Sequence, residues 1–220
     1  MSVYLKLITP LKEIEKLILE EIKNIINSAL YQSKFTIKSL FTPELEKQMY
    51  NSDEYHSLKS SVLRGELGVI DAEITTRAIV EFIIERLTIT IVPMEIRGSE
   101  LNGGIKIVFL REQDAEDLFE QMSFMSEGSL KFNRPPAKVD WLRWLLTKGT
   151  EVVVENMVFK PWPYNPPSRT GLGIMRYSKR NWSVPPEFAG TKDDNWITRA
   201  LIQAGPVWAD ILIDNINKEL

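Results

Sequence analysis

The pattern of apolar and polar positions predicts a helix near the start of the chain. Between Pro10 and Leu30, apolar residues recur every three or four positions, and lysine and glutamate fill most of the intervening ones. The apolar positions are Ile14, Leu17, Ile18, Ile22, Ile25, Ile26 and Ala29. Thr9 has a side chain suited to a helix N-cap, and proline fits the first helical position. We therefore expect an amphipathic helix from Pro10 to about Leu30.

Further helices are predicted before residue 87. Thr42-Pro43 in TPELEKQM is again a helix-start signal, within a polar stretch that reaches about Ser61 and favours short helices. Asp71 is expected to cap a helix over Ala72 to Arg86. The predicted buried face of that helix consists of Ile74, Ala78, Ile79, Phe82 and Ile83.

After residue 86 the pattern changes to the alternation of a β-strand. Apolar and polar residues alternate in RLTITIVPMEIRG, and a second apolar run, GGIKIVFL, follows. Asn102-Gly103-Gly104 between them has turn chemistry, which predicts a β-hairpin. Pro93 lacks an N–H group and therefore indicates an edge strand or a bulge.

Short elements are predicted farther along the chain. The segment DWLRWLLTKG indicates a short helix ended by Gly149. It carries Trp141 and Trp144 on one face, where core packing is the first expectation and a partner groove the second. The segments EVVVENMVF, GLGIMRYS and RNWSVP are predicted strands.

The last helix is predicted from a capping pattern. Thr191 and Asp194 have capping-box spacing and should open a helix that runs from about Asp194 to the C-terminus. Its apolar stripe consists of Ile197, Leu201, Ala204, Trp208, Ile211 and Leu212. Gly205-Pro206 is expected to kink this helix or divide it in two.

Together these elements predict an α+β fold. A small, mainly antiparallel sheet is flanked by a long N-terminal helix and a C-terminal helix. Residues 1–86 would form a helical segment, and residues 87–220 an α+β body with a Pro/Trp-rich loop. We expect the two parts to make one compact domain, which suits a chain of 220 residues.

Composition and charge limit the functional classes. The 27 basic and 30 acidic residues nearly balance, so the overall basic excess typical of nucleic-acid-binding domains is absent. The chain has no cysteine, which excludes disulfides and thiolate chemistry. Lys6 and Pro10 interrupt the first apolar run, and no run approaches the roughly 18 apolar residues of a membrane helix. We expect synthesis in the cytoplasm and no membrane contact.

Catalytic groups are sparse. His56 is the single histidine, expected on an exposed helix surface, and its neighbour Ser57 does not by itself make a triad. Asp193 and Asp194 could hold a divalent metal in a hydrolase or nuclease, but acidic residues at a helix start are the simpler interpretation. The segments GLGIM and GELG lack the spacing of phosphate-binding loops. We expect neither an enzyme nor a cofactor.

Aromatic and proline residues suggest protein contacts instead. Lys160 to Thr170 contains four prolines, and stiff extended segments lose little entropy on docking. Trp162, Tyr164 and Arg169 are its candidate anchors, because Trp, Tyr and Arg dominate interface energies. Packing of this loop on its own sheet is the equal alternative. Basic residues near it, Arg169, Arg176, Lys179 and Arg180, are expected at a solvated strand edge, with nucleic-acid contact as the weaker alternative.

The segment NWSVPPEFAGTKDDNWITRAL extends this set of candidate contacts. Its proline pair stiffens the chain, Gly190 permits a sharp turn, and Thr191 is a capping residue. We interpret the segment as one that positions a helix and exposes aromatic side chains to a partner. The candidate contacts here are Trp182, Phe188 and Trp196.

The C-terminal motifs resemble a known family. SRTGLGIM, then NWSVPPEFAGTKDDNWITRAL, then an apolar helix are similar to the last part of the neck, or tail-completion, proteins that join heads and tails of tailed bacteriophages. The similarity covers roughly the last 60 residues. It is carried by Ser168 to Leu172, by Gly190 and Thr191, and by Trp196, Ala200 and Leu201.

The resemblance implies a virion structural protein without catalytic residues. Several copies would form a ring between portal and tail, contact other neck, connector and tail proteins, and let DNA pass as cargo. A tail-terminator or head–tail connector ring is the alternative within the virion. A metal-dependent hydrolase or nuclease and a bacterial adaptor that recognises Pro-rich segments are the alternatives outside it.

Overall fold

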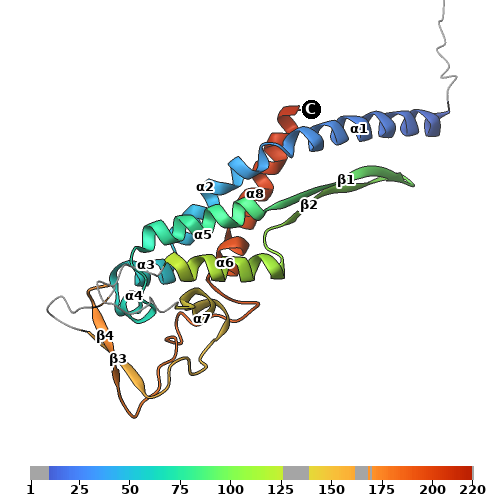
Figure 1. Cartoon of the computed structure of the whole chain (residues 1–220). Coiled ribbons are helices and arrows are strands. Elements are labelled where there is room, and N and C mark those ends of the chain that lie inside the picture. The colour runs from blue at the N-terminus through green and yellow to red at the C-terminus, as the bar shows by residue number, and fades with distance from the viewer. Residues whose placement is uncertain (1–9, 126–138, 162–167, 169, 220) are drawn as a thin grey trace, which may run out of the picture.

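The computed structural model describes residues 10–125, 139–161, 168 and 170–219 (Figure 1). Its helices are α1 (Leu11–Ser33), α2 (Ile37–Tyr50), α3 (Asp53–Ser60), α4 (Val62–Leu67), α5 (Ala72–Arg86), α6 (Glu112–Met125), α7 (Trp141–Thr147) and α8 (Trp196–Glu219). Its strands are β1 (Thr88–Arg97), β2 (Glu100–Val108), β3 (Met157–Pro161) and β4 (Gly173–Tyr177). The predicted α+β class is confirmed. The strands form two separate antiparallel pairs, β1–β2 and β3–β4.

The centre of the molecule is a helical core in which α2 packs on α8 and on α5. Residues four apart on α2 are fully buried, namely Ile37, Phe41, Leu45 and Met49. From α8, Trp208 enters this core, where its ring stacks on those of Phe41 and Phe109. The core therefore joins the predicted N-terminal segment to the C-terminal part of the chain.

The start signal predicted at Thr42-Pro43 is wrong, because both residues lie inside α2. Pro43 is exposed, so its ring points to solvent while the opposite face carries the buried stripe. Burial of that stripe outweighs the local preference of proline for a first turn. Ser52 is a true N-cap nearby, since its side chain accepts from the backbone N–H of Tyr55.

The prediction for α5 is confirmed at its start and corrected on its buried face. Asp71 accepts hydrogen bonds from the backbone N–H groups of Glu73 and Ile74. Ile79 is fully buried, but Ile74 is 58% exposed. Five residues on a helix correspond to a rotation of about 140°, so Ile74 points away from the core that Ile79 faces.

The hairpin β1–β2 forms as predicted, but its turn lies elsewhere. Arg97 pairs with Glu100, which leaves Gly98-Ser99 as a two-residue turn with φ of +69° at Gly98. Such a turn with glycine first matches the twist of paired strands. Asn102-Gly103-Gly104 belongs to β2, opposite an irregularity between Val92 and Glu95 that confirms the bulge predicted from the proline in β1.

The bulge explains the glycine at position 103. A Cβ atom there would lie 2.7 Å from the carbonyl oxygen of Pro93 and 2.7 Å from the Cα atom of Met94. Only a glycine allows the backbone of the bulged strand to approach so closely.

The hairpin and α1 form an arm on one side of the molecule, away from α7 and the β3–β4 pair (Figure 1). Asn27 joins α1 to the hairpin, because its side chain accepts a 2.7 Å hydrogen bond from the backbone N–H of Met94. The first helix begins at Leu11, one residue after the predicted start, and continues to Ser33. The proposed cap Thr9 lies outside the described residues.

The smaller elements agree with the prediction in part. Gly149, with φ of +54°, follows α7 and ends it as expected. EVVVENMVF is a strand only from Met157, and RNWSVP makes only an isolated bridge between Trp182 and Val154. His56 is exposed on α3, as predicted.

The last helix starts later than predicted and is not divided. Asn195 is its N-cap: the backbone N–H of Thr198 donates to Asn195 Oδ1, and the Asn195 N–H donates to Thr198 Oγ1. This reciprocal pair is a capping box displaced from the one predicted at Thr191 and Asp194. Pro206 lies within the continuous helix and is exposed, so Gly205-Pro206 does not divide the helix in two, and the alternative expectation of a kink stays a prediction. In the described parts of the chain, no helix is long and apolar enough to cross a membrane.

Candidate docking surfaces

The candidate anchors of the Pro-rich loop are not among the described residues. Trp162, Tyr164 and Arg169 lie outside the described residues, so their contact with a partner stays a prediction. In the sequence the loop follows β3 and precedes β4.

Two of the other three predicted contacts are core residues. Trp182 is 6% exposed and Trp196 is 1% exposed, whereas Phe188 is half-buried against the same core. An indole enclosed by its own chain offers no surface to a partner in this conformation. The interpretation of Trp182 and Trp196 as exposed docking residues is therefore corrected. Local sequence shows that a residue is aromatic, but burial depends on distant elements.

Trp182 has a structural role at a bridge between two loops. Its backbone N–H donates to the carbonyl of Val154 over 2.8 Å, and its ring lies 6.2 Å from that of Trp144. Burial raises the pKa of Glu66, and a hydrogen bond with the Trp182 side chain opposes that rise. Trp182 thus holds its own loop to Val154 by a backbone hydrogen bond and binds the carboxyl group of Glu66 on α4.

The segment from Asn181 to Leu201 fastens the start of α8 to α7. The Gly190 N–H donates to the carbonyl of Leu145, and the Gly149 N–H donates to the carbonyl of Gly190, each over 2.9 Å. A Cβ atom at Gly190 would lie 2.6 Å from the Cβ of Asn195 and 2.9 Å from the oxygen of Leu145. Gly190 is therefore required by close packing, and the segment is mainly architectural.

The surroundings of Asp193 and Asp194 do not resemble those of a metal site. Both are exposed, and Asp194 forms a 2.7 Å ion pair with Arg199. The same arginine binds the buried carboxylate of Glu54, which ties α8 to α3. Within the described residues there is no group of three or more His, Cys, Asp or Glu side chains that could hold a metal ion.

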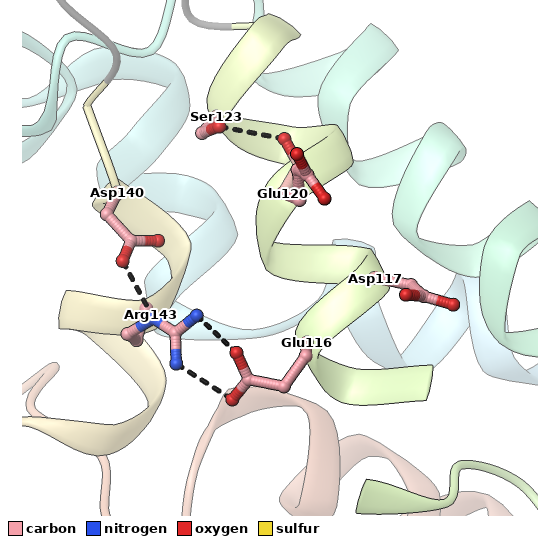
Figure 2. A pocket seen from close by; sticks show the side chains of 6 residues that line it. All are labelled: Glu116, Asp117, Glu120, Ser123, Asp140 and Arg143. Atoms are coloured by element: carbon pink, nitrogen blue, oxygen red, sulfur yellow. Dashed lines mark hydrogen bonds and ion pairs between the residues drawn. The ribbon is translucent and has the colours of Figure 1, made fainter. Parts of the chain in front are cut away.

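A cavity of about 390 Å³ between α6 and α7 is lined mainly by charged side chains (Figure 2). Arg143 connects the two helices that line it: the guanidinium donates to Asp140 over 2.7 Å and to Glu116 over 2.8 Å. The guanidinium also lies 4.6 Å from the ring centroid of Phe119. The arginine thereby holds α6 against α7.

The same contacts shift the pKa values of Glu116 and Arg143. The hydrogen bond from Arg143 lowers the pKa of Glu116, and its partner carboxylates raise the pKa of Arg143. Asp117 points toward α5, where it pairs with Arg86 over 3.6 Å. Because the pKa of Glu116 is lowered, this carboxyl group is poorly suited to donate a proton as a general acid. The cavity has the chemistry of a helix–helix contact.

A larger and more apolar hollow lies between α6, α7 and the start of α8; we call it the α6–α8 groove. Its volume is about 650 Å³, and its floor consists of Phe109, Leu118, Phe119, Leu146, Ile197 and Leu201, of which Phe109 and Leu201 are partly exposed and the other four are buried. The partly exposed Ala115 also lines it. Two ion pairs lie at the rim, Glu112 with Lys192 over 2.9 Å and Glu116 with Arg143. This size and lining are typical of sites that receive an apolar ligand or a helix.

The arm carries a second apolar surface. Leu11, Ile18, Ile22 and Ile25 on α1 are 69%, 52%, 39% and 38% exposed; we call this set the α1 stripe. Asn27, which binds the hairpin, is nine residues from Ile18. At 100° per residue this is two and a half turns, so the two side chains point in opposite directions. The stripe therefore faces away from the hairpin. The amphipathic pattern predicted for this helix is present, but most of its apolar face is not buried within the chain.

The groove is absent from the sites predicted above, because no helix is predicted there for residues 112–125. The apolar residues Ala115, Leu118, Phe119 and Met122 recur at helical spacing and could have identified α6. The groove itself also needs α7 and α8, and no local pattern shows which helices will enclose a hollow.

Comparisons with known proteins add no relative: no protein-family model, curated protein or solved structure matches the chain.

Proposed function

We propose that the chain is a structural protein of a tailed-phage virion, a neck or tail-completion subunit. In this proposal several copies form a ring that joins the DNA-filled head to the tail, and the DNA passes as cargo. The protein would be made in the host cytoplasm and reside in the virion. Its partners would be other neck, connector and tail proteins.

The observation that carries the proposal is the α1 stripe on a projecting arm. Contiguous large apolar side chains at helical spacing are the kind of surface that protein partners cover. The second support is the resemblance of roughly the last 60 residues, whose first motif begins at Ser168, to neck proteins. The stripe favours assembly, and the resemblance favours this assembly over others.

The experiment is electron microscopy of a lysate in which the gene carries a nonsense codon. The expected result is separate DNA-filled heads and finished tails. Particles with heads and tails normally joined would contradict the proposal. A defect in DNA processing would instead favour the hydrolase or nuclease alternative. Tails of abnormal length would favour the tail-terminator position.

A second variant tests the Pro-rich loop. Deletion of residues 160–170 should block joining, because it removes the predicted contacts Trp162, Tyr164 and Arg169. The matched control replaces only those three residues by alanine and keeps the loop length. Normal particles from both variants would rule out the loop as a docking element.

A further inference from the structure

We propose that the α6–α8 groove receives the α1 stripe of a second copy of this chain. The proposal deepens the ring assembly proposed above and rests on it for its biological setting. It assigns the two surfaces that would make each contact of the ring.

The groove has the character of a helix-binding site. A hollow of about 650 Å³ with an aromatic and aliphatic floor suits the apolar face of an amphipathic helix, which is recognised through residues spaced i, i+4 and i+7. Phe119 belongs to α6 and Ile197 to α8, so both helices contribute to that floor.

The α1 stripe has the matching spacing. Ile18, Ile22 and Ile25 occupy positions i, i+4 and i+7, and Leu11 extends the same face by two turns. A helix that leaves such a face uncovered gains little stability from its own chain and is suited to a partner.

The two surfaces cannot meet within one molecule. The α1 helix packs on the hairpin and on α8, and it points away from α6 and α7 in Figure 1. A contact between different patches on two copies is heterologous, and such contacts close into rings when the rotation between copies allows it.

Acidic side chains flank the stripe, and basic side chains lie at the rim of the groove. Glu15 and Glu21 flank the stripe, and neither forms an ion pair among the described residues. Arg111 and Lys192, whose side chains are 65% and 78% exposed, already pair within the chain, with Asp114 and Glu112, so Glu15 and Glu21 of a second copy would share or exchange these partners. Opposite charges at a rim direct the orientation of docking more than they add affinity.

The test measures self-association of the purified full chain by light scattering and analytical ultracentrifugation. Ile18→Glu should weaken association at least about tenfold, and Ala115→Trp, which fills the groove, should do the same. Leu17→Glu is the control for the stripe, because Leu17 is 67% exposed but lies a quarter-turn or more from Ile18. Gln121→Trp is the control for the groove, since Gln121 is exposed on α6 outside its lining.

Mixing the two variants distinguishes this contact between different surfaces from a symmetrical contact that uses the same surface on both copies. The Ile18→Glu chain keeps its groove and the Ala115→Trp chain keeps its stripe, so together they should form a one-to-one dimer although each alone is monomeric. Thermal unfolding of each variant shows whether it is folded. A wild-type chain that stays monomeric up to about 100 µM would overturn the proposal. So would variants that assemble like wild type, or a mixture that stays monomeric.

Because the chain lacks cysteine, disulfide trapping gives an independent measurement. A chain with Ile18→Cys mixed with one carrying Ala115→Cys should form a mixed disulfide-linked dimer, whereas Leu17→Cys should not. Preferential linkage of Ile18→Cys to itself would show a pairing of two α1 helices and overturn the proposal. These experiments contain no phage component, so their failure is distinct from a failure of the neck function.

Discussion

The ring of Trp208 lies nearly parallel to that of Phe41, with 4.8 Å between their centroids, and its indole N–H donates to the Phe41 carbonyl over 3.2 Å. One side chain thus joins α2 and α8 by stacking and by a hydrogen bond. The two residues are 167 positions apart in the sequence.

Replacement of Trp208 should cause the largest loss of stability on α8. Trp208→Ala leaves a cavity between two stacked rings and should lower the free energy of unfolding by about 3–5 kcal/mol. Urea denaturation measures this loss. Ile202→Ala, on the same helix but 73% exposed, should change the free energy by less than about 0.5 kcal/mol. Similar losses for both variants would show that α8 does not pack as described.

The cap of α8 gives a second prediction. Asn195→Ala removes the acceptor for the Thr198 N–H and should cost about 1–2 kcal/mol of unfolding free energy. Thr191→Ala removes a 3.2 Å hydrogen bond from the Asp194 N–H and a long, 3.5 Å one to the Asp194 carbonyl, and should cost less, about 0.5 kcal/mol. The reverse order in thermal or urea unfolding would place the box at Thr191 and Asp194, as the sequence pattern first indicates.

Asp114 should make stability depend on acid pH. Hydrogen bonds from the side chain and then the backbone of Arg111 lower the pKa of Asp114, with burial opposing them. A carboxyl with a lowered pKa stabilises the fold above its unfolded value of about 3.9, and this contribution is lost as pH falls through the folded pKa. Asp114→Asn should therefore destabilise the protein at pH 7 and have a smaller effect near pH 3.

Urea denaturation of wild type and Asp114→Asn at both pH values measures this difference. Asp117→Asn is the control: its carboxylate lies on the same helix and is 46% exposed, so its removal should have a small effect at either pH. An equal cost of Asp114→Asn at pH 7 and pH 3 would contradict the assignment.

Two glycines should respond to alanine in opposite directions. Gly103→Ala places a Cβ against the backbone of the bulge and should cost about 1–3 kcal/mol. Gly205→Ala, inside α8 with no atom within 4 Å of the new methyl group, should stabilise by about 0.5–1 kcal/mol. Thermal unfolding of the two variants measures both signs. A tolerated alanine at position 103 would contradict the register of the hairpin.

The hairpin shows how far the sequence predicts the fold. Alternation and Pro93 identify two strands and a bulge, but both Gly98-Ser99 and Asn102-Gly103-Gly104 have turn chemistry. The choice between them depends on which residues face α1, and local chemistry does not encode that contact. The pattern therefore predicts the element and misplaces its turn.

The candidate docking residues show what the sequence does not predict. Aromatic residues in a Pro-rich context indicate a docking loop, yet Trp182 and Trp196 are buried by helices from other parts of the chain. The exposed apolar residues of α1 are easily recognised as amphipathic, but periodicity alone does not show whether a face is covered. Exposure is a tertiary property, and the sequence predicts only which residues could have it.

The packing of α2 on α8 also fixes when the protein can fold. Synthesis proceeds from the N-terminus, so α2 is complete long before the ribosome makes the helix that covers it. The apolar face around Phe41 must wait until α8 has been made, so this core forms only after residues 196–219 leave the ribosome. A ribosome that stops shortly before α8 would release a chain with an open core, a substrate for chaperones and proteases rather than a shortened working subunit.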